Sequence, residues 1–247
     1  MIRTAPASAA TISIVCGCMN RQETLQRALP TWLAAPEIDE IAIVDWSSAD
    51  PVRRVTDTLG DPRVKVFRVE GQRRWIASKC HNLGLRVASG DVLLRLDADY
   101  LLEPAFFQKH ALSDGVFFCG NWRRARTDNE RHLTGALFVH RRHVLDLNGY
   151  NERIITYGYE DDDLFERLER AGLARRDIDL DTVHHIAHDD LARTRHQDVV
   201  NVQWETERNK ALAHSCPWSA GDRMTAWERR AADDGGAVYV EAGKANL

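Results

Sequence analysis

The chain has 247 residues, 44% hydrophobic and 28% charged, which suffices for a sizeable core but not for two full-size domains. Its net charge of −4 argues against bulk nucleic-acid binding, which needs a basic surface. No apolar run approaches the roughly 20 residues that cross a bilayer, and the N-terminus lacks the apolar region of a signal peptide. Five cysteines without a Cys-x-x-Cys pair indicate reduced thiols. We therefore expect a cytoplasmic protein, for which peripheral membrane association stays open.

The first hundred residues alternate short β-branched runs with segments of helical spacing. The expected strands cover 11–15, 41–44, 64–69 and 92–96, and the expected helices cover 21–33, 51–59 and 78–87. This alternation predicts an α/β protein with a single, Rossmann-like, mostly parallel sheet flanked by helices. In such sheets, ligands bind at the carboxyl ends of the strands.

The second half is less regular. Strands are expected at 116–119 and 136–139, and helices at 141–147, 161–171, 199–213 and 224–232. Residues 178–188 alternate weakly and end in histidines. We expect one domain over residues 1–190, with residues 191–247 as a helical extension packed on it.

Two carboxylates, Asp97 and Asp99, follow the fourth expected strand. In a turn, both can approach one hard cation, and carboxylate oxygens suit Mg²⁺ or Mn²⁺, which bridge pyrophosphate oxygens. The simpler explanation is that aspartate commonly ends a strand.

Four acids, residues 160–163, precede an apolar helical pattern. Acids complement the dipole at a helix start, which explains one or two of them. Four in a row repel each other, and a crowded or partly dehydrated carboxylate has a raised pKa and can act as a general base. The sequence therefore indicates a functional role for some of these acids.

Three histidines, His184, His185 and His188, lie within five residues. Imidazole suits transition metals, although an exposed polar loop would also explain the cluster. On an extended strand His184 points opposite His185, so at most two of the three are expected to be ligands.

These segments together resemble the GT-A glycosyltransferases. Asn20-Arg21, the Ile-Val-Asp-Trp-Ser-Ser stretch and Leu-Asp-Ala-Asp are similar to glycosyltransferase family 2. Asn-Gly-Tyr-Asn-Glu and Tyr-Gly-Tyr-Glu-Asp-Asp-Asp resemble the galactosyltransferase module of β-1,4-galactosyltransferases and bacterial chondroitin polymerases. The resemblance covers about residues 11–190 and implies the GT-A fold.

The resemblance also implies roles for individual residues. Asp99 and His188 would bind the metal, with His185 as a further ligand, and Mn²⁺ is expected ahead of Mg²⁺. Asp161 would be the catalytic base, and Glu160 and Asp162 would orient the donor sugar or the acceptor. The expected nucleotide-binding residues are Arg21, Asp45, Lys79 and Asp97, and Trp122 is a candidate for stacking on a sugar.

The implied function is an inverting, metal-dependent glycosyltransferase that moves a hexose or N-acetylhexosamine from a UDP-sugar to a hydroxyl of a glycan or other acceptor. One alternative is a nucleotidyltransferase that makes sugar nucleotides. Such enzymes usually carry a Gly-rich phosphate loop after the first strand, where only Gly17 is found. The other alternative is a non-catalytic nucleotide-sugar-binding module.

Overall fold

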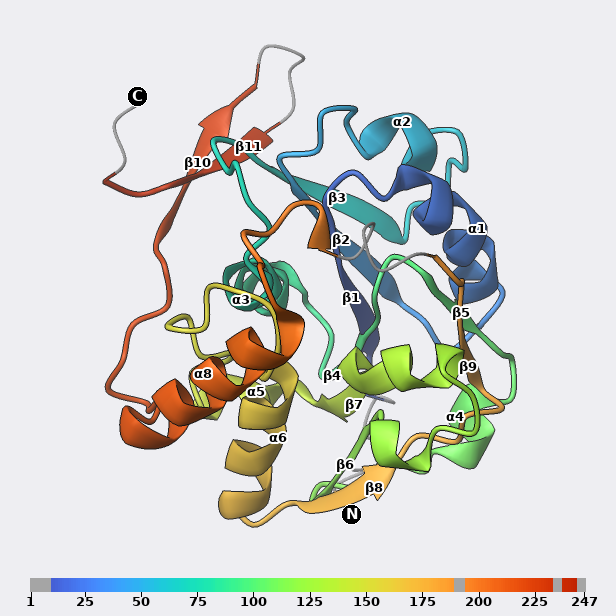
Figure 1. The fold of residues 1–247 in the computed structure, drawn as a ribbon. Helices are drawn as coiled ribbons and strands as arrows, with labels where there is room; N and C mark the ends of the chain where they lie inside the picture. The colour runs from blue at the N-terminus through green and yellow to red at the C-terminus, as the bar shows by residue number, and fades with distance from the viewer. Residues whose placement is uncertain (1–9, 189–193, 233–236, 244–247) are drawn as a thin grey trace, which may run out of the picture.

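The structure, a computed structural model, describes residues 10–188, 194–232 and 237–243. Within them a nine-stranded sheet runs in the order β10-β11-β3-β2-β1-β4-β7-β6-β8, with helices on both faces (Figure 1). Its strands are β1 (Ile12–Cys18), β2 (Glu40–Trp46), β3 (Val64–Val69), β4 (Val92–Arg95), β6 (Val116–Cys119), β7 (Leu137–His140), β8 (Ala174–Asp177), β10 (Trp227–Ala231) and β11 (Ala237–Glu241). A separate antiparallel pair is formed by β5 (Tyr100–Leu102) and β9 (Val183–His185).

The helices connect and cover these strands. They are α1 (Gln22–Leu33), α2 (Arg53–Thr56), α3 (Ala77–Val87), α4 (Phe106–Lys109), α5 (Arg141–Asp146), α6 (Glu160–Arg170) and α8 (Val202–Ser215), with 3₁₀ turns η1 (Trp122–Arg124) and η2 (Asn129–Gly135). The central order β3-β2-β1-β4 is parallel throughout, and β7 pairs antiparallel with β4 and β6. This confirms the expected mostly parallel α/β sheet.

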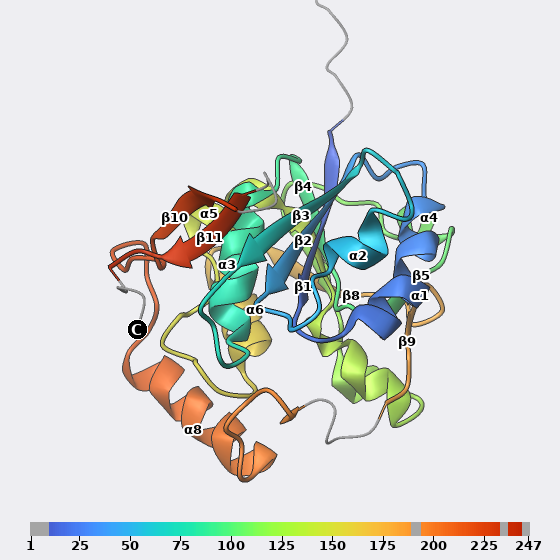
Figure 2. The same cartoon turned by 90° about the horizontal axis from the view of Figure 1, so that it is seen from above.

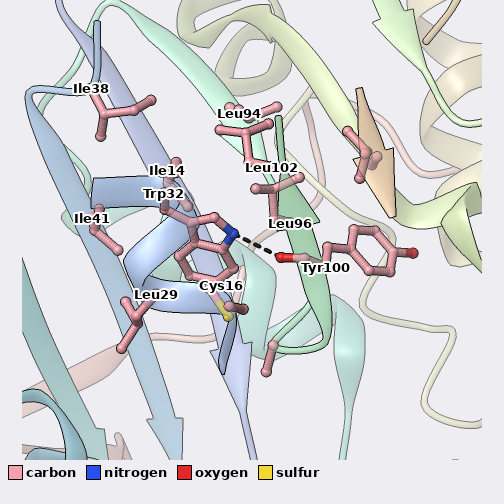
Figure 3. Close-up of a cluster of buried hydrophobic side chains, with 14 of the residues drawn as sticks. Ile14, Cys16, Leu29, Trp32, Ile38, Ile41, Leu94, Leu96, Tyr100 and Leu102 are labelled. Atoms are coloured by element: carbon pink, nitrogen blue, oxygen red, sulfur yellow. Dashed lines mark hydrogen bonds between the residues drawn. The ribbon is translucent and has the colours of Figure 1, made fainter. Parts of the chain in front are cut away.

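The side-chain alternation of β1 divides the core into two layers. Ile14 and Cys16 face the cluster built on α1, whereas Val15 faces the cluster built on α3, α5 and α6. The two sets of helices lie on opposite sides of the sheet (Figure 2). In the α1 layer, the indole of the fully buried Trp32 donates a hydrogen bond of 2.8 Å to the Tyr100 carbonyl (Figure 3). This bond ties α1 to β5 beside the carboxyl ends of the strands.

The expected helix over 224–232 is wrong, because this segment contains strand β10. β10 pairs antiparallel with β11, and β11 adds parallel to β3 at the sheet edge. Trp227 also packs edge-on against Trp46, with ring centroids 5.4 Å apart. Among its described residues, the extension that follows residue 190 is therefore only partly helical, and β10 and β11 lengthen the main sheet. The helix expected over 51–59 is also shorter, since α2 covers only Arg53–Thr56.

All five cysteines are unpaired thiols, four of them buried. In the part of the chain that the structure describes, no helix combines the length and the apolar surface needed to cross a membrane.

Candidate active site

A cavity of about 320 Å³ opens at the carboxyl edge of the sheet. Its walls come from the end of β1, the turn after β4, β9 and the loop that follows it, the start of α6, and α8. Asp99, Asp161 and His188, which are far apart in the sequence, all line it. The expected convergence of these residues is therefore present in the fold.

Asp99, His185 and His188 form one cluster of possible metal ligands. One donor atom from each lies within 4.8 Å of the others. The Nε2 atom of His188 is 2.9 Å from Asp99 Oδ2 and 3.2 Å from His185 Nε2. The pairing of β5 with β9 creates this arrangement, since Ile186 donates its backbone N–H to the Asp99 carbonyl at 2.7 Å.

The strand alternation of β9 decides which histidines enter the site. His185 is buried beside Asp99, whereas the exposed His184 points away and lies 3.2 Å from Glu103. This agrees with the expectation that at most two of the three histidines act together. One carboxylate oxygen and two imidazole nitrogens suit Mn²⁺ or another transition metal better than Ca²⁺ or Mg²⁺.

Asn129, on η2, orients the His185 ring. Its Oδ1 lies 2.6 Å from His185 Nδ1, and its Nδ2 donates to the His185 carbonyl at 2.9 Å. A hydrogen bond to Nδ1 places the ring proton there and leaves the Nε2 lone pair for a metal. Nothing in the local sequence around Asn129 indicates this role.

Arg21 closes the other side of the cluster, with its NH1 3.2 Å from Asp99 Oδ2. Burial raises the pKa of Asp99, but the hydrogen bond with His188 and the charges of His185 and Arg21 outweigh burial and lower it below its ordinary value. Asp99 is thus held in the ionised form that a metal ligand requires.

The acids at the start of α6 divide into two groups. Glu160, Asp161 and Asp162 line the cavity. Asp163 is buried on the other side and forms a 2.8 Å ion pair with Arg167, which also donates to the carbonyls of residues 147 and 149. Helix structure therefore explains one of the four acids, as the sequence analysis allowed, and three remain for chemistry.

Two of these acids have strongly raised pKa values. Desolvation, with the charge of Asp161 added, raises the pKa of Glu160 to about 8. Desolvation also raises the pKa of Asp161 to about 6; the charge of Arg95 opposes this rise, and the charges of Asp97 and Asp162 add to it. Among the described residues, Glu160 Oε2 and Asp161 Oδ1 have no hydrogen-bond partner although both atoms are buried.

Arg95, which the sequence analysis did not single out, is the buried cation inside this acidic cluster. Its NH2 lies 2.8 Å from Asp97 Oδ1 and 2.6 Å from His81 Nε2. Burial and the charge of Arg95 hold the pKa of His81 well below its usual range, so His81 accepts as neutral imidazole. A Cβ at Gly135 would collide with the guanidinium, so glycine provides its space.

The structure places two expected nucleotide-binding residues outside this cavity. Lys79 points toward β11 and pairs with Glu241 at 2.7 Å. Asp45 is fully buried near the end of β2, where it accepts hydrogen bonds from the backbone of residues 48 and 52 and pairs with Arg68 at 2.8 Å. Both side chains are engaged with protein partners that the local sequence could not reveal, and their contact with a nucleotide stays a prediction. Arg21 and Asp97, in contrast, line the cavity.

Aromatic rings complete the walls of the cavity. Trp122 is 40% exposed, and Tyr157 and Tyr159 precede the acidic helix. Trp75, which the sequence analysis did not identify, reaches the end of β1, where Gly17 leaves room for its ring. Ring faces that border a cavity in this way can stack on sugars or bases.

Two family models match the sequence. Glycosyl transferase family 2 matches residues 13–146, and the N-terminal domain of galactosyltransferase matches residues 121–189. A comparison with curated proteins finds no significant match.

Solved structures share the fold at low sequence identity. The catalytic domain of Drosophila β1,4-galactosyltransferase 7, in complex with xylobiose, has a TM-score of 0.60 at 16% identity and covers 94% of this chain and 93% of its own. A variant of that enzyme in complex with manganese, UDP-Gal and xylobiose has a TM-score of 0.58 at 18% identity with the same coverage. Glucosyl-3-phosphoglycerate synthase from Mycobacterium tuberculosis, in complex with Mn²⁺, UDP and phosphoglyceric acid, has a TM-score of 0.59 at 15% identity and covers 95% of this chain and 88% of its own. The fold is thus that of GT-A glycosyltransferases. Because the family model spans more than half of the sequence, the chain belongs to glycosyl transferase family 2.

Proposed function

We propose that the protein is an inverting, metal-dependent glycosyltransferase that moves a hexose or N-acetylhexosamine from a UDP-sugar to a hydroxyl of a glycan or other acceptor. The observation that carries this proposal is the meeting of two groups in one cavity. Asp99, His185 and His188 offer metal ligands, and Glu160 and Asp161 offer carboxylates with raised pKa values. The UDP and Mn²⁺ named with the similar structures support the same choice of donor and metal.

The ligand cluster would hold Mn²⁺, with Mg²⁺ as the second candidate. Donor atoms from Asp99, His185 and His188 already lie within 4.8 Å of one another, and Asn129 directs a lone pair of His185 toward them. A divalent cation held there supplies Lewis-acid stabilisation of the charge on a departing diphosphate.

Asp161 would remove the proton from the attacking acceptor hydroxyl. Its unpartnered oxygen lies at the cavity wall, and with a pKa of about 6 it is ionised at neutral pH yet more basic than an ordinary aspartate. Glu160 and Asp162 would orient the sugar hydroxyls. Attack on the face opposite the departing diphosphate inverts the anomeric centre.

Arg95 would help Asp161 to stay ionised within the acidic cluster. Its positive charge lowers the pKa of Asp161, against the neighbouring acids, and it holds Asp97 through a 2.8 Å ion pair. Trp122 and Tyr157 would offer ring faces to the sugars.

The direct test incubates the protein with a panel of UDP-sugars, with and without Mn²⁺, and follows UDP release in the presence of candidate glycan acceptors. Metal-dependent release that is lost in Asp99→Ala supports the proposal. Pyrophosphate release from UTP and a sugar phosphate would favour the nucleotidyltransferase instead. Tight, Mn²⁺-dependent UDP binding with no turnover of any donor would favour a binding module.

A further inference from the structure

We infer that α8, in the C-terminal extension, completes the active site, and that Asn209 is the residue through which it positions the turn leading into the acidic helix. This inference rests on the proposed glycosyl transfer. Figure 1 shows α8 beside α6, although about 30 residues of chain separate the end of α6 from the start of α8.

The buried face of α8 is unusual because it carries polar side chains. Glu205, Asn209 and Ala213 are buried at four-residue intervals, and Asn209 is completely inaccessible. A helix that only docks on a domain usually buries an apolar stripe. Buried polar groups need specific partners, so this face is directed at particular atoms.

Those partners are backbone carbonyls of the turn before α6 and the side-chain hydroxyl of Thr156. The Asn209 amide donates to the carbonyls of Tyr157 at 3.1 Å and Gly158 at 2.9 Å. Thr156 donates to Glu205 Oε2 at 2.8 Å. One amide group therefore holds two consecutive carbonyls of the turn, and a second polar contact fixes the residue that precedes them.

The turn held in this way is conformationally demanding. Gly158 has φ of 90° and Tyr159 has φ of 73°, which lies in the left-handed region that non-glycine residues rarely adopt. Such a residue costs on the order of 1 kcal/mol or more and persists only where its surroundings enforce it. Asn209 supplies part of that enforcement.

The conformation of Tyr159 decides where the acids enter the cavity. Tyr159 is the N-cap residue of α6, so Glu160 and Asp161 follow it directly. Thr206, also on α8, lines the cavity, and a Cβ at position 158 would collide with it. The extension thus forms part of the cavity wall and sets the direction of the carboxylates.

The metal ligands are held by other elements, namely β9 with its following loop and the turn before β5. Loss of Asn209 should therefore affect proton transfer more than it affects UDP binding with Mn²⁺. If Asn209 only stabilised the fold, its loss would reduce proton transfer and UDP binding together, in step with thermal stability.

The experiment compares Asn209→Ala and Asn209→Asp with Gln203→Ala, a substitution of an exposed residue on another face of the same helix. The aspartate keeps the size of asparagine but cannot donate to the two carbonyls. For each full-length variant, kcat and KM of transfer, Mn²⁺-dependent UDP binding by calorimetry, and Tm are measured.

We expect both Asn209 variants to lose kcat by on the order of 10- to 100-fold, with UDP affinity within about twofold of the wild type. Gln203→Ala should match the wild type. Unchanged kcat in Asn209→Ala, or a parallel loss of kcat, UDP affinity and Tm, overturns the inference while leaving the proposed function intact. A wild-type protein that turns over no donor overturns both.

Discussion

Replacing Asp161 by asparagine should make the protein more stable and nearly inactive at the same pH. The pKa of Asp161 is raised to about 6, so its ionised form is disfavoured in the fold relative to the unfolded chain. Asp161 favours the folded state most when it is protonated. Its contribution to the free energy of unfolding is therefore fully present below about pH 4, the pKa in the unfolded chain, and is lost as pH rises toward 6. Above pH 6 the penalty is constant at about 3 kcal/mol, which Asp161→Asn removes.

The neighbouring Asp163 provides a matched control with the opposite sign. It is the same residue type two positions later in the same helix, but it is paired with the buried Arg167 at 2.8 Å. Asp163→Asn leaves that guanidinium without its counter-charge and should cost about 3 to 5 kcal/mol. Both variants remove one negative charge, so a change in net charge cannot explain a difference between them.

The assay is thermal unfolding without metal at pH 7.5 and pH 4.5, combined with a transfer assay at pH 7.5. At pH 7.5, Asp161→Asn should raise Tm by about 5 to 10 °C, and the gain in unfolding free energy should shrink to about a third at pH 4.5. The kcat of transfer should fall by about 10²- to 10⁴-fold. If Asp161→Asn transfers sugar at the wild-type rate, or if its Tm at pH 7.5 is no higher than that of the wild type, Asp161 is not a catalytic base with a raised pKa.

Three further predictions concern the surroundings of the site. Asn129→Ala should weaken Mn²⁺ binding by about 10- to 100-fold because the adjacent histidine ring loses its orientation, and unchanged affinity in a calorimetric titration would contradict this. EDTA should abolish transfer, and added Mn²⁺ should restore it in the wild type but not in Asp99→Asn; recovery in the variant would show that the metal binds elsewhere. Gly135→Ala should displace Arg95 and reduce kcat about tenfold or more. Gly115→Ala is the control, because a Cβ there meets open space, and it should leave kcat unchanged. Equal kcat values for the two variants would show that Arg95 has no role in the reaction.

Much of the fold is readable from local pattern. The alternation of β-branched runs with helical spacing predicts the mostly parallel sheet to which β1 to β4 belong, because each strand and helix carries its own periodicity. The second carboxylate of the Asp-x-Asp turn and the clustered histidines are recognisable because their chemistry is concentrated in a few adjacent residues. Strand alternation alone separates His184 from His185.

The roles that depend on distant partners could not be read in this way. Segment 224–232 has enough helical character to suggest a helix, but pairing with β11 at the edge of β3 makes it a strand. The ion pair of Lys79 with Glu241, which lies 162 residues away, could likewise not be read from the sequence around Lys79.

The sequence by itself determined the class of the sheet and the residue types available for metal binding and proton transfer. The tertiary structure decided which of the four acids is held in an ion pair and which three line the cavity, which histidines meet Asp99, and that Arg95 and Asn209 belong to the site. The physical reason is that periodicity and residue chemistry are local properties of the chain. Burial, pKa and hydrogen-bond partnership depend on atoms that only folding brings into contact.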